Sequence, residues 1–278
     1  MAQLDRLSRL KRFFSPQLAE LIVDGGAEDP LQTHRREVTV VFLDLRGFTA
    51  FAETAEPEEV MGVLREYHAA MGALILAHEG TLERFAGDGM MVFFNDPVPV
   101  PNAPERAVRM ALAMRDRARE LGARWRKRGY ELDIGIGIAQ GFATIGAIGF
   151  EGRLDYGAIG TVTNLAARLC GVAKPGQILV SQRLLGAVEA LAEAEPVGEL
   201  PFKGFSKPMP TFNVVGLKAS SPEPPREAEL AGPGFRVGPS APPSARGGAQ
   251  QREGSRRGGA RSWRARCPSG STDARRDP

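Results

Sequence analysis

Short runs of β-branched and aromatic residues alternate with long amphipathic segments between residues 37 and 217. Residues 37–45 (EVTVVFLDL) are apolar almost throughout, which is typical of a buried strand. Residues 56–80 and 103–125 carry apolar residues at helical spacing, and each has a proline near its start. These periods predict strands that are covered by long helices.

The rest of this region fixes the order of the elements. Residues 81–87 and 89–95 read as two strands around a tight turn, and residues 131–149 as a long strand whose glycines indicate bulges or close backbone approach. A helix over 160–173 and a strand, a helix and a closing hairpin over 176–217 follow. The β-α-β-β-α-β order predicts an α/β (α+β) fold with a ferredoxin-like sheet and helices on one face.

Both flanks differ from this central domain. Residues 1–36 are expected to form an N-terminal helical segment of two short helices and a linker, with Ser15-Pro16 as a helix start. Residues 37–217 are the expected folded domain. Residues 218–278 are rich in Pro, Gly and Arg and are predicted to be a disordered tail, because few apolar side chains offset the entropy of ordering.

The net charge of +3 is unevenly distributed. From residue 219 onward there are eleven Arg, no Lys and six Asp or Glu, so the first 218 residues carry about −2. The body therefore gives little reason to expect binding to DNA. Two distant cysteines suggest no disulfide framework, no apolar run is long enough to span a membrane, and no signal peptide is evident. We expect a cytoplasmic protein.

Two aspartates stand out as candidate metal ligands. Asp44 interrupts the apolar strand 37–45, and a lone buried carboxylate is costly unless it is paired or bound to a metal. Asp88 lies between two glycines at the tip of the hairpin. If the first strand lies beside this hairpin, the two carboxylates converge. With no His or Cys cluster nearby, they suit Mg²⁺ or Mn²⁺.

The segment after Asp44 adds a candidate phosphate site. In LRGFTA, a glycine-bearing turn leads into a helix, and the free N–H groups of Gly47, Phe48 and Thr49 are the expected donors to phosphate. Two metals beside a phosphate cradle indicate two-metal phosphoryl chemistry.

Three segments in combination, VTVVFLDLRGFTAFAE, FAGDGMMVFF and YGAIGTVTNLAARL, resemble the catalytic domain of the class III nucleotide cyclases, the adenylate and guanylate cyclases. The resemblance covers about residues 37–217. It implies that Asp44 and Asp88 bind two metal ions per active site, with the backbone carbonyl of Leu45 helping to hold the second ion. It also implies a head-to-tail homodimer with active sites at the interface, and attack of the ribose 3′-hydroxyl on the α-phosphate.

The resemblance assigns further residues. Asn164 and Arg168 are four residues apart on one helix face, and by resemblance they orient the ribose and stabilise charge on the phosphorus. Lys203, in LPFKGFSKP, is the candidate contact to the triphosphate. Where some members place an arginine on the fourth strand, this chain has Phe142.

The base-reading positions depart from the family pattern. Adenylate cyclases place a lysine four residues before the second metal aspartate, where this chain has Arg84, and an aspartate or threonine where it has Gly157. Guanylate cyclases place a glutamate and a cysteine or similar residue there. A cation at position 84 is closer to the ATP pattern, so we expect an adenylate cyclase that makes 3′,5′-cyclic AMP and pyrophosphate with modest base discrimination.

Three alternatives stay open on the sequence. The first is a guanylate or relaxed-specificity cyclase. The second is a catalytically weak module that binds nucleotide, which the altered base-reading pair favours and the intact Asp44, Asp88, Asn164 and Arg168 oppose. The last is an RNA-binding module, which ranks lowest because the strands lack paired exposed aromatic residues. The sequence does not identify a regulatory input or a role for the tail.

Overall fold

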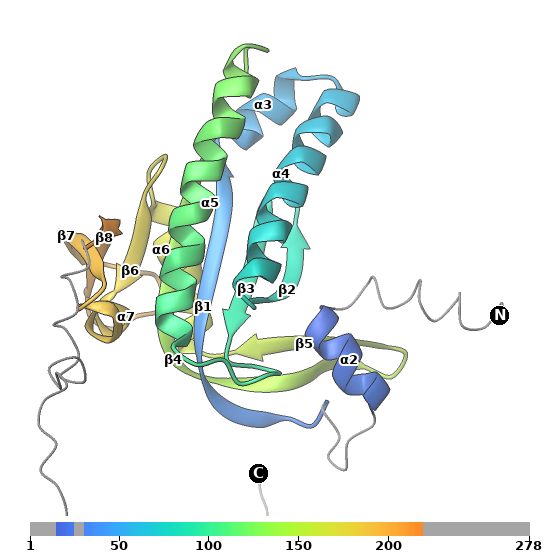
Figure 1. Cartoon of the computed structure of the whole chain (residues 1–278), viewed down its shortest axis with the longest axis vertical. Coiled ribbons are helices and arrows are strands. Elements are labelled where there is room, and N and C mark those ends of the chain that lie inside the picture. Colours follow the sequence, from blue (N-terminus) through green and yellow to red (C-terminus); the bar gives the residue numbers. More distant parts are fainter. Residues whose placement is uncertain (1–14, 25–30, 219–278) are drawn as a thin grey trace, which may run out of the picture. The chain divides into compact units, whose positions relative to one another are not determined.

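A computed structural model describes residues 15–24 and 31–218. Figure 1 shows the elements along the chain. In order, they are α2 (Pro16–Asp24), β1 (His34–Arg46), α3 (Phe48–Thr54), α4 (Pro57–Ala77), β2 (Thr81–Ala86), β3 (Gly89–Phe94), α5 (Ala103–Arg126), β4 (Asp133–Phe150), β5 (Arg153–Ile159), α6 (Thr161–Val172), β6 (Ile178–Ser181), α7 (Gln182–Val188), β7 (Ala192–Leu200) and β8 (Met209–Leu217).

The strands form one mixed sheet in the order β2-β3-β1-β4-β6-β8-β7, with β5 paired to β4. The central strand β1 pairs antiparallel with β3 on one side and with β4 on the other. This β2-β3-β1-β4 core is the predicted ferredoxin-like arrangement, and the α/β class is confirmed. Beyond the core, β6 runs parallel to β4 and begins the extension of the sheet toward β8 and β7.

Side chains of β1 alternate between two hydrophobic cores. Val41, Leu43 and Leu45 face the larger core, which the buried faces of α4, α5 and α7 complete (Figure 1). Val38 and Val40 point to the opposite face and pack in the second core, to which α6 contributes. The structure therefore differs from the expectation of helices on one face only, because α6 covers the other face of the sheet.

Glycines of β4 explain how closely α6 approaches the sheet. A Cβ atom on Gly137 would lie 2.1 Å from the backbone nitrogen of Cys170 and 2.3 Å from the carbonyl oxygen of Ala166. No other residue fits such a contact, so the DIGIGI pattern sets the helix directly on the strand. The close backbone approach predicted for this strand is confirmed here.

Helix α4 is the one helix of the described part of the chain whose length and mean hydropathy would allow it to span a membrane. Its inner face is instead part of the larger core, with Val63, Tyr67, Met71 and Ile75 buried. Each such side chain stabilises the fold by about 1.5–3 kcal/mol through burial. Core helices commonly have this composition, and α4 packs as one.

The N-terminal boundary differs from the sequence expectation. Residues 34–36, predicted to belong to a linker, begin β1 and pair with β4, with His34 opposite Ile145. Of the two predicted N-terminal helices, the second is α2, while the first lies outside the described residues, as does the tail from residue 219. The polar run HRRE has no apolar pattern that would predict a strand. Its partner, the extension of β4, is itself partly exposed, so apolar residues are not required there.

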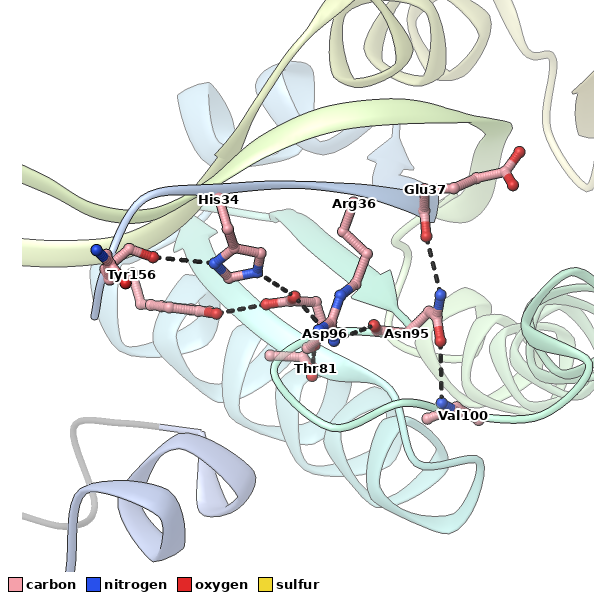
Figure 2. Close-up of polar contacts among 9 residues, drawn as sticks. His34, Arg36, Glu37, Thr81, Asn95, Asp96, Val100 and Tyr156 are labelled. Carbon is pink, nitrogen blue, oxygen red and sulfur yellow. Dashed lines mark hydrogen bonds and ion pairs between the residues drawn. The ribbon is translucent and has the colours of Figure 1, made fainter. Parts of the chain in front are cut away.

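A buried carboxylate, Asp96, ties the start of β1 to two other parts of the fold (Figure 2). His34 Nε2 lies 2.7 Å and Arg36 Nη1 lies 3.3 Å from its Oδ2 atom, and the hydroxyl of Tyr156 on β5 donates to Oδ1. The hydroxyl of Thr81 donates to the Asp96 carbonyl. Asp96 raises the pKa of His34 through this hydrogen bond, and the charge of Asp96 is compensated within the network.

Candidate active site

Asp44 and Asp88 meet at one end of the sheet, as the sequence predicts. The antiparallel register pairs Leu43 with Met90, which brings the turn before β3 beside the end of β1. The backbone N–H of Leu45 donates to Asp88 Oδ2 at 3.3 Å. A Cβ atom on Gly89 would lie 3.7 Å from Asp44 Oδ1, so the turn closes against this carboxylate. Two carboxylates thus share one small region.

Their proximity has an electrostatic cost. Burial and the neighbouring Asp44 carboxylate raise the pKa of Asp88 to about 7, while the Leu45 N–H opposes the shift. Two like charges in partial burial are the arrangement that a divalent cation relieves, and oxygen ligands suit Mg²⁺ or Mn²⁺. Within residues 15–24 and 31–218, no three His, Cys, Asp or Glu side chains cluster. The Asp44–Asp88 pair fits an ion whose remaining ligands are water and substrate oxygens.

Arg46 connects this carboxylate pair to α6. Its Nη1 atom donates to Asp44 Oδ2 at 3.2 Å, Nε donates to the Ala173 carbonyl at 2.8 Å, and Nη2 donates to the Cys170 carbonyl. The planar guanidinium fits because Gly135 has no side chain: a Cβ there would lie 2.4 Å from Nη2 of Arg46. The sequence analysis did not identify Arg46, although its place in DLRG beside Asp44 was a signal.

The predicted phosphate-binding turn lies directly after β1. Gly47 has φ 85°, and a Cβ there would lie 2.6 Å from the carbonyl oxygen of Glu131, so this position requires glycine. Phe48 begins α3 and its ring lies 6.0 Å from that of Phe51, while Thr49 is exposed. The turn is therefore placed beside Asp44 by local geometry, and its role toward phosphate stays a prediction.

The two base-reading positions come together through a residue that the sequence analysis missed. Arg84 is 61 % exposed on β2, and its Nη2 atom lies 2.6 Å from Oε1 of Glu83, whose side chain is only 2 % exposed. A Cβ on Gly157 of β5 would lie 2.6 Å from the same Oε1. The Glu83 carboxylate therefore lies against Gly157. An acidic residue directly before Arg84 was the available signal.

A cavity of about 980 Å³ borders this pair. Its lining comes from β2, β5, α4 and α2, and it includes Glu83, Arg84 and Asp155. The volume lies at the upper end of the range of small-molecule sites, which is about 300–1,000 Å³.

The remaining predicted residues are exposed. Asn164 and Arg168 lie on the solvent-facing side of α6, and Lys203 lies in the loop between β7 and β8. Phe142 is exposed on β4, and the Arg35 guanidinium lies 4.7 Å from its ring centroid. Among the described residues, no hydrogen bond or ion pair joins Asn164, Arg168 or Lys203 to Asp44 or Asp88. Among the described residues of one chain, these contacts therefore do not join the Asp44–Asp88 pair to the second group, which is Asn164, Arg168 and Lys203.

Comparisons with known proteins show the family of the chain. The family model described as the adenylate and guanylate cyclase catalytic domain matches residues 31–216. "Adenylate cyclase 1" of Rhizobium meliloti is 34 % identical over 216 residues, which are 77 % of this chain and 32 % of the relative. An adenylate cyclase of Anabaena cylindrica is 31 % identical over 171 residues, 60 % of this chain and 34 % of the relative. This chain thus spans about a third of the length of these curated relatives.

Solved structures agree with the fold. The adenylyl cyclase CyaB from P. aeruginosa is 36 % identical with a TM-score of 0.65, and the match covers 66 % of this chain and 96 % of that one. The guanylyl cyclase Cya2 is 34 % identical with a TM-score of 0.62, covering 66 % of this chain and 94 % of that one. An adenylyl cyclase and a guanylyl cyclase are therefore similarly close to this chain. This chain belongs to the adenylate and guanylate cyclase catalytic domain family, the class III nucleotide cyclases.

Proposed function

We propose that the chain is an adenylate cyclase that converts ATP to 3′,5′-cyclic AMP and pyrophosphate. The observation that carries this proposal is the pairing of Asp44 with Asp88, where burial and then the neighbouring Asp44 carboxylate raise the pKa of Asp88 to about 7. Such a pair is unfavourable by itself and is stabilised by a divalent cation. In the reaction, the O3′–Pα bond forms, the bond from Pα to the pyrophosphate oxygen breaks, and the hydroxyl proton departs.

Each predicted residue has a part in this proposal. Asp44, Asp88 and the Leu45 carbonyl would hold two Mg²⁺ or Mn²⁺ ions, which supply activation of the hydroxyl and charge neutralisation on the phosphates. The turn formed by Gly47, Phe48 and Thr49 donates backbone N–H groups to phosphate.

The exposed residues act on the other side of the substrate. Asn164 orients the ribose, and Arg168 stabilises the negative charge that develops on the α-phosphate. Lys203 contacts the triphosphate. Because these side chains are exposed and are not joined to Asp44 and Asp88 in one chain, we propose a head-to-tail homodimer in which a second copy completes each site.

The choice of ATP over GTP rests on Arg84. Its guanidinium has donors and no acceptor, which suits the N1 acceptor of adenine. Gly157 offers no side chain, and guanine O6 is also an acceptor, so a guanylate or relaxed-specificity cyclase is the second candidate. The similar identity of a guanylyl cyclase supports keeping it.

The proposal extends to the chain as a whole. We propose that residues 37–217 are the catalytic domain, that residues 1–36 are an N-terminal segment, that residues 218–278 form a tail, and that the protein acts in the cytoplasm. The curated relatives are about three times as long as the region that they share with this chain.

The first experiment measures cyclic nucleotide production from ATP and from GTP with Mn²⁺ or Mg²⁺, using the purified full chain. We expect cyclic AMP from ATP, at a higher kcat/KM than cyclic GMP from GTP. Asp44→Asn should reduce kcat by at least about 100-fold, because it removes a carboxylate from the pair that would hold the metals.

Asp116→Asn is the matched control, since Asp116 is an exposed carboxylate on α5 that, among the described residues, forms ion pairs with Arg115 and Arg119. It should retain wild-type activity. A faster reaction with GTP would make the chain a guanylate cyclase. Binding of ATP without turnover in any metal would identify a nucleotide-binding module instead.

A further inference from the structure

We propose that Glu83 determines base specificity, by supplying from β2 the hydrogen-bond acceptor that Gly157 lacks. In this proposal Glu83 accepts from the 6-amino group of adenine while Arg84 donates to N1. The inference rests on the proposed function, because it assumes that the chain binds ATP as a substrate.

The backbone of β2 aims Glu83 away from the regular ladder. Leu82 pairs with Val92 and Arg84 pairs with Met91, so Glu83 is an extra residue that has no partner on β3. Such a bulge redirects a side chain. Here the Glu83 side chain turns toward β5 and becomes almost fully buried against Gly157.

Glu83 is an incompletely satisfied carboxylate. Oε1 accepts from Arg84, whereas Oε2 is buried and has no hydrogen-bond partner among the described residues. Burial raises the pKa of Glu83, and Arg84 opposes that shift. A buried acceptor without a donor is costly, and a fold that retains one often uses it. What Oε2 lacks is an N–H donor.

Gly157 leaves the space that the Glu83 carboxylate occupies. Even the smallest side chain at position 157 would bring its Cβ within 2.6 Å of Glu83 Oε1 and within 3.2 Å of Ile148 Cδ1. Glycine at position 157 therefore leaves room for the Glu83 carboxylate, and a larger residue at this position would not. The acceptor that β5 lacks at position 157 comes from Glu83 of β2.

The adenine edge complements this pair. N1 is an acceptor and the adjacent 6-amino group is a donor, while Arg84 supplies donors and Glu83 supplies acceptors. Arg84 is mostly exposed, so its guanidinium can turn from Oε1 toward N1, which opens the carboxylate to the amino group. The bordering cavity of about 980 Å³ gives a purine room beside the pair.

The test compares ATP with purine riboside 5′-triphosphate, which lacks the 6-amino group and keeps N1. In the wild-type chain with Mn²⁺, we expect kcat/KM to favour ATP by about 10- to 100-fold, as is typical of hydrogen bonds to a charged group. In Glu83→Ala this ratio should fall to near 1, because only ATP loses a contact. A loss shared equally by both substrates would mean that Glu83 is merely structural.

Two further variants separate the acceptor from the position that carries it. Glu83→Ala/Gly157→Asp places a carboxylate on β5 in the vacated space, and it should restore the preference for ATP. Gly157→Ala should displace the Glu83 carboxylate and lower the preference. If neither result is seen, and thermal melting shows that both variants are folded, the proposal is overturned. Glu105→Ala is the control, since Glu105 also pairs with an arginine but lies on α5; its ratio should match wild type.

The outcomes distinguish this inference from the proposed function. A wild-type chain that does not cyclise ATP overturns both. A chain that cyclises ATP with an ATP preference unaffected by Glu83→Ala overturns only the role of Glu83.

Discussion

At the scale of single residues, the Asp44–Asp88 pair has a predictable effect on the free energy of unfolding. Burial and the neighbouring carboxylate raise the pKa of Asp88 from 3.8 to about 7. Between these values the folded chain holds a proton that the unfolded chain has released. The free energy of unfolding of the metal-free protein must therefore fall as pH rises from about 4 to 7.

This sign gives a prediction for Asp88→Asn. In EDTA at pH 8, the variant should be more stable than the wild type by about 1–2 kcal/mol, once solvent screening of a half-exposed carboxyl is allowed for. At pH 4.5 the difference should nearly vanish. Urea denaturation followed by circular dichroism at both pH values measures it.

The pH dependence that His34 contributes must be separated from that of Asp88. Asp96 raises the pKa of His34, so its stabilising contribution is present at low pH and is lost as pH rises through that raised value. The wild type and Asp88→Asn both keep His34, so the difference in stability between them isolates Asp88. A difference that is independent of pH would mean that the two carboxylates do not interact in solution.

At the scale of elements, periodicity predicted most of the strands and helices, while tertiary contacts decided the rest. The apolar run before Asp44 and the two long amphipathic segments correspond to β1, α4 and α5. The polar start of β1 and most of β7 carry no such period, because the start of β1 is only partly buried, β7 is largely exposed, and both are held by backbone pairing.

The candidate site was predictable to a similar degree. The sequence placed Asp44 beside Asp88 because an apolar strand and a tight hairpin have few arrangements in this fold. It did not place Glu83, since a β-bulge arises from pairing with β3 and has no clear local signal. The sequence also led us to expect α6 on the same face of the sheet as the other helices. The glycines of β4 against which α6 packs lie far from α6 in the chain, so this contact has no local signal.

Arg46 is expected to anchor α6 to the end of β1. It holds the carbonyls of Cys170 and Ala173 at the C-terminal end of α6 and pairs with Asp44. Arg46→Met should destabilise the chain by about 2–3 kcal/mol, since partly buried carbonyl groups lose a charged donor. Urea denaturation at pH 7.5 measures the loss.

Arg46→Lys is the matched control, because it keeps the charge but not the planar fork. We expect it to fall between Arg46→Met and the wild type. If Arg46→Met unfolds at the wild-type urea concentration, the guanidinium does not anchor α6.

At the scale of the whole molecule, the main question is whether one chain holds a complete site. Asp44 and Asp88 lie together at the end of β1, whereas Asn164 and Arg168 are exposed on α6. The proposed homodimer joins one group from each copy. It follows that a defect in each group should be repairable by a partner with the other defect, because each copy still carries what its partner lacks.

Complementation provides the last prediction. Asp44→Asn and Arg168→Ala should each be inactive alone. After mixing and subunit exchange, half of the dimers would be heterodimers with one intact site of two, so about a quarter of wild-type activity should return. The double variant Asp44→Asn/Arg168→Ala, mixed with either single variant, should restore none, because every site then has a defect. If the two single variants stay inactive when co-expressed and shown to form heterodimers, Asp44 and Arg168 act within the same chain, and the head-to-tail arrangement is wrong.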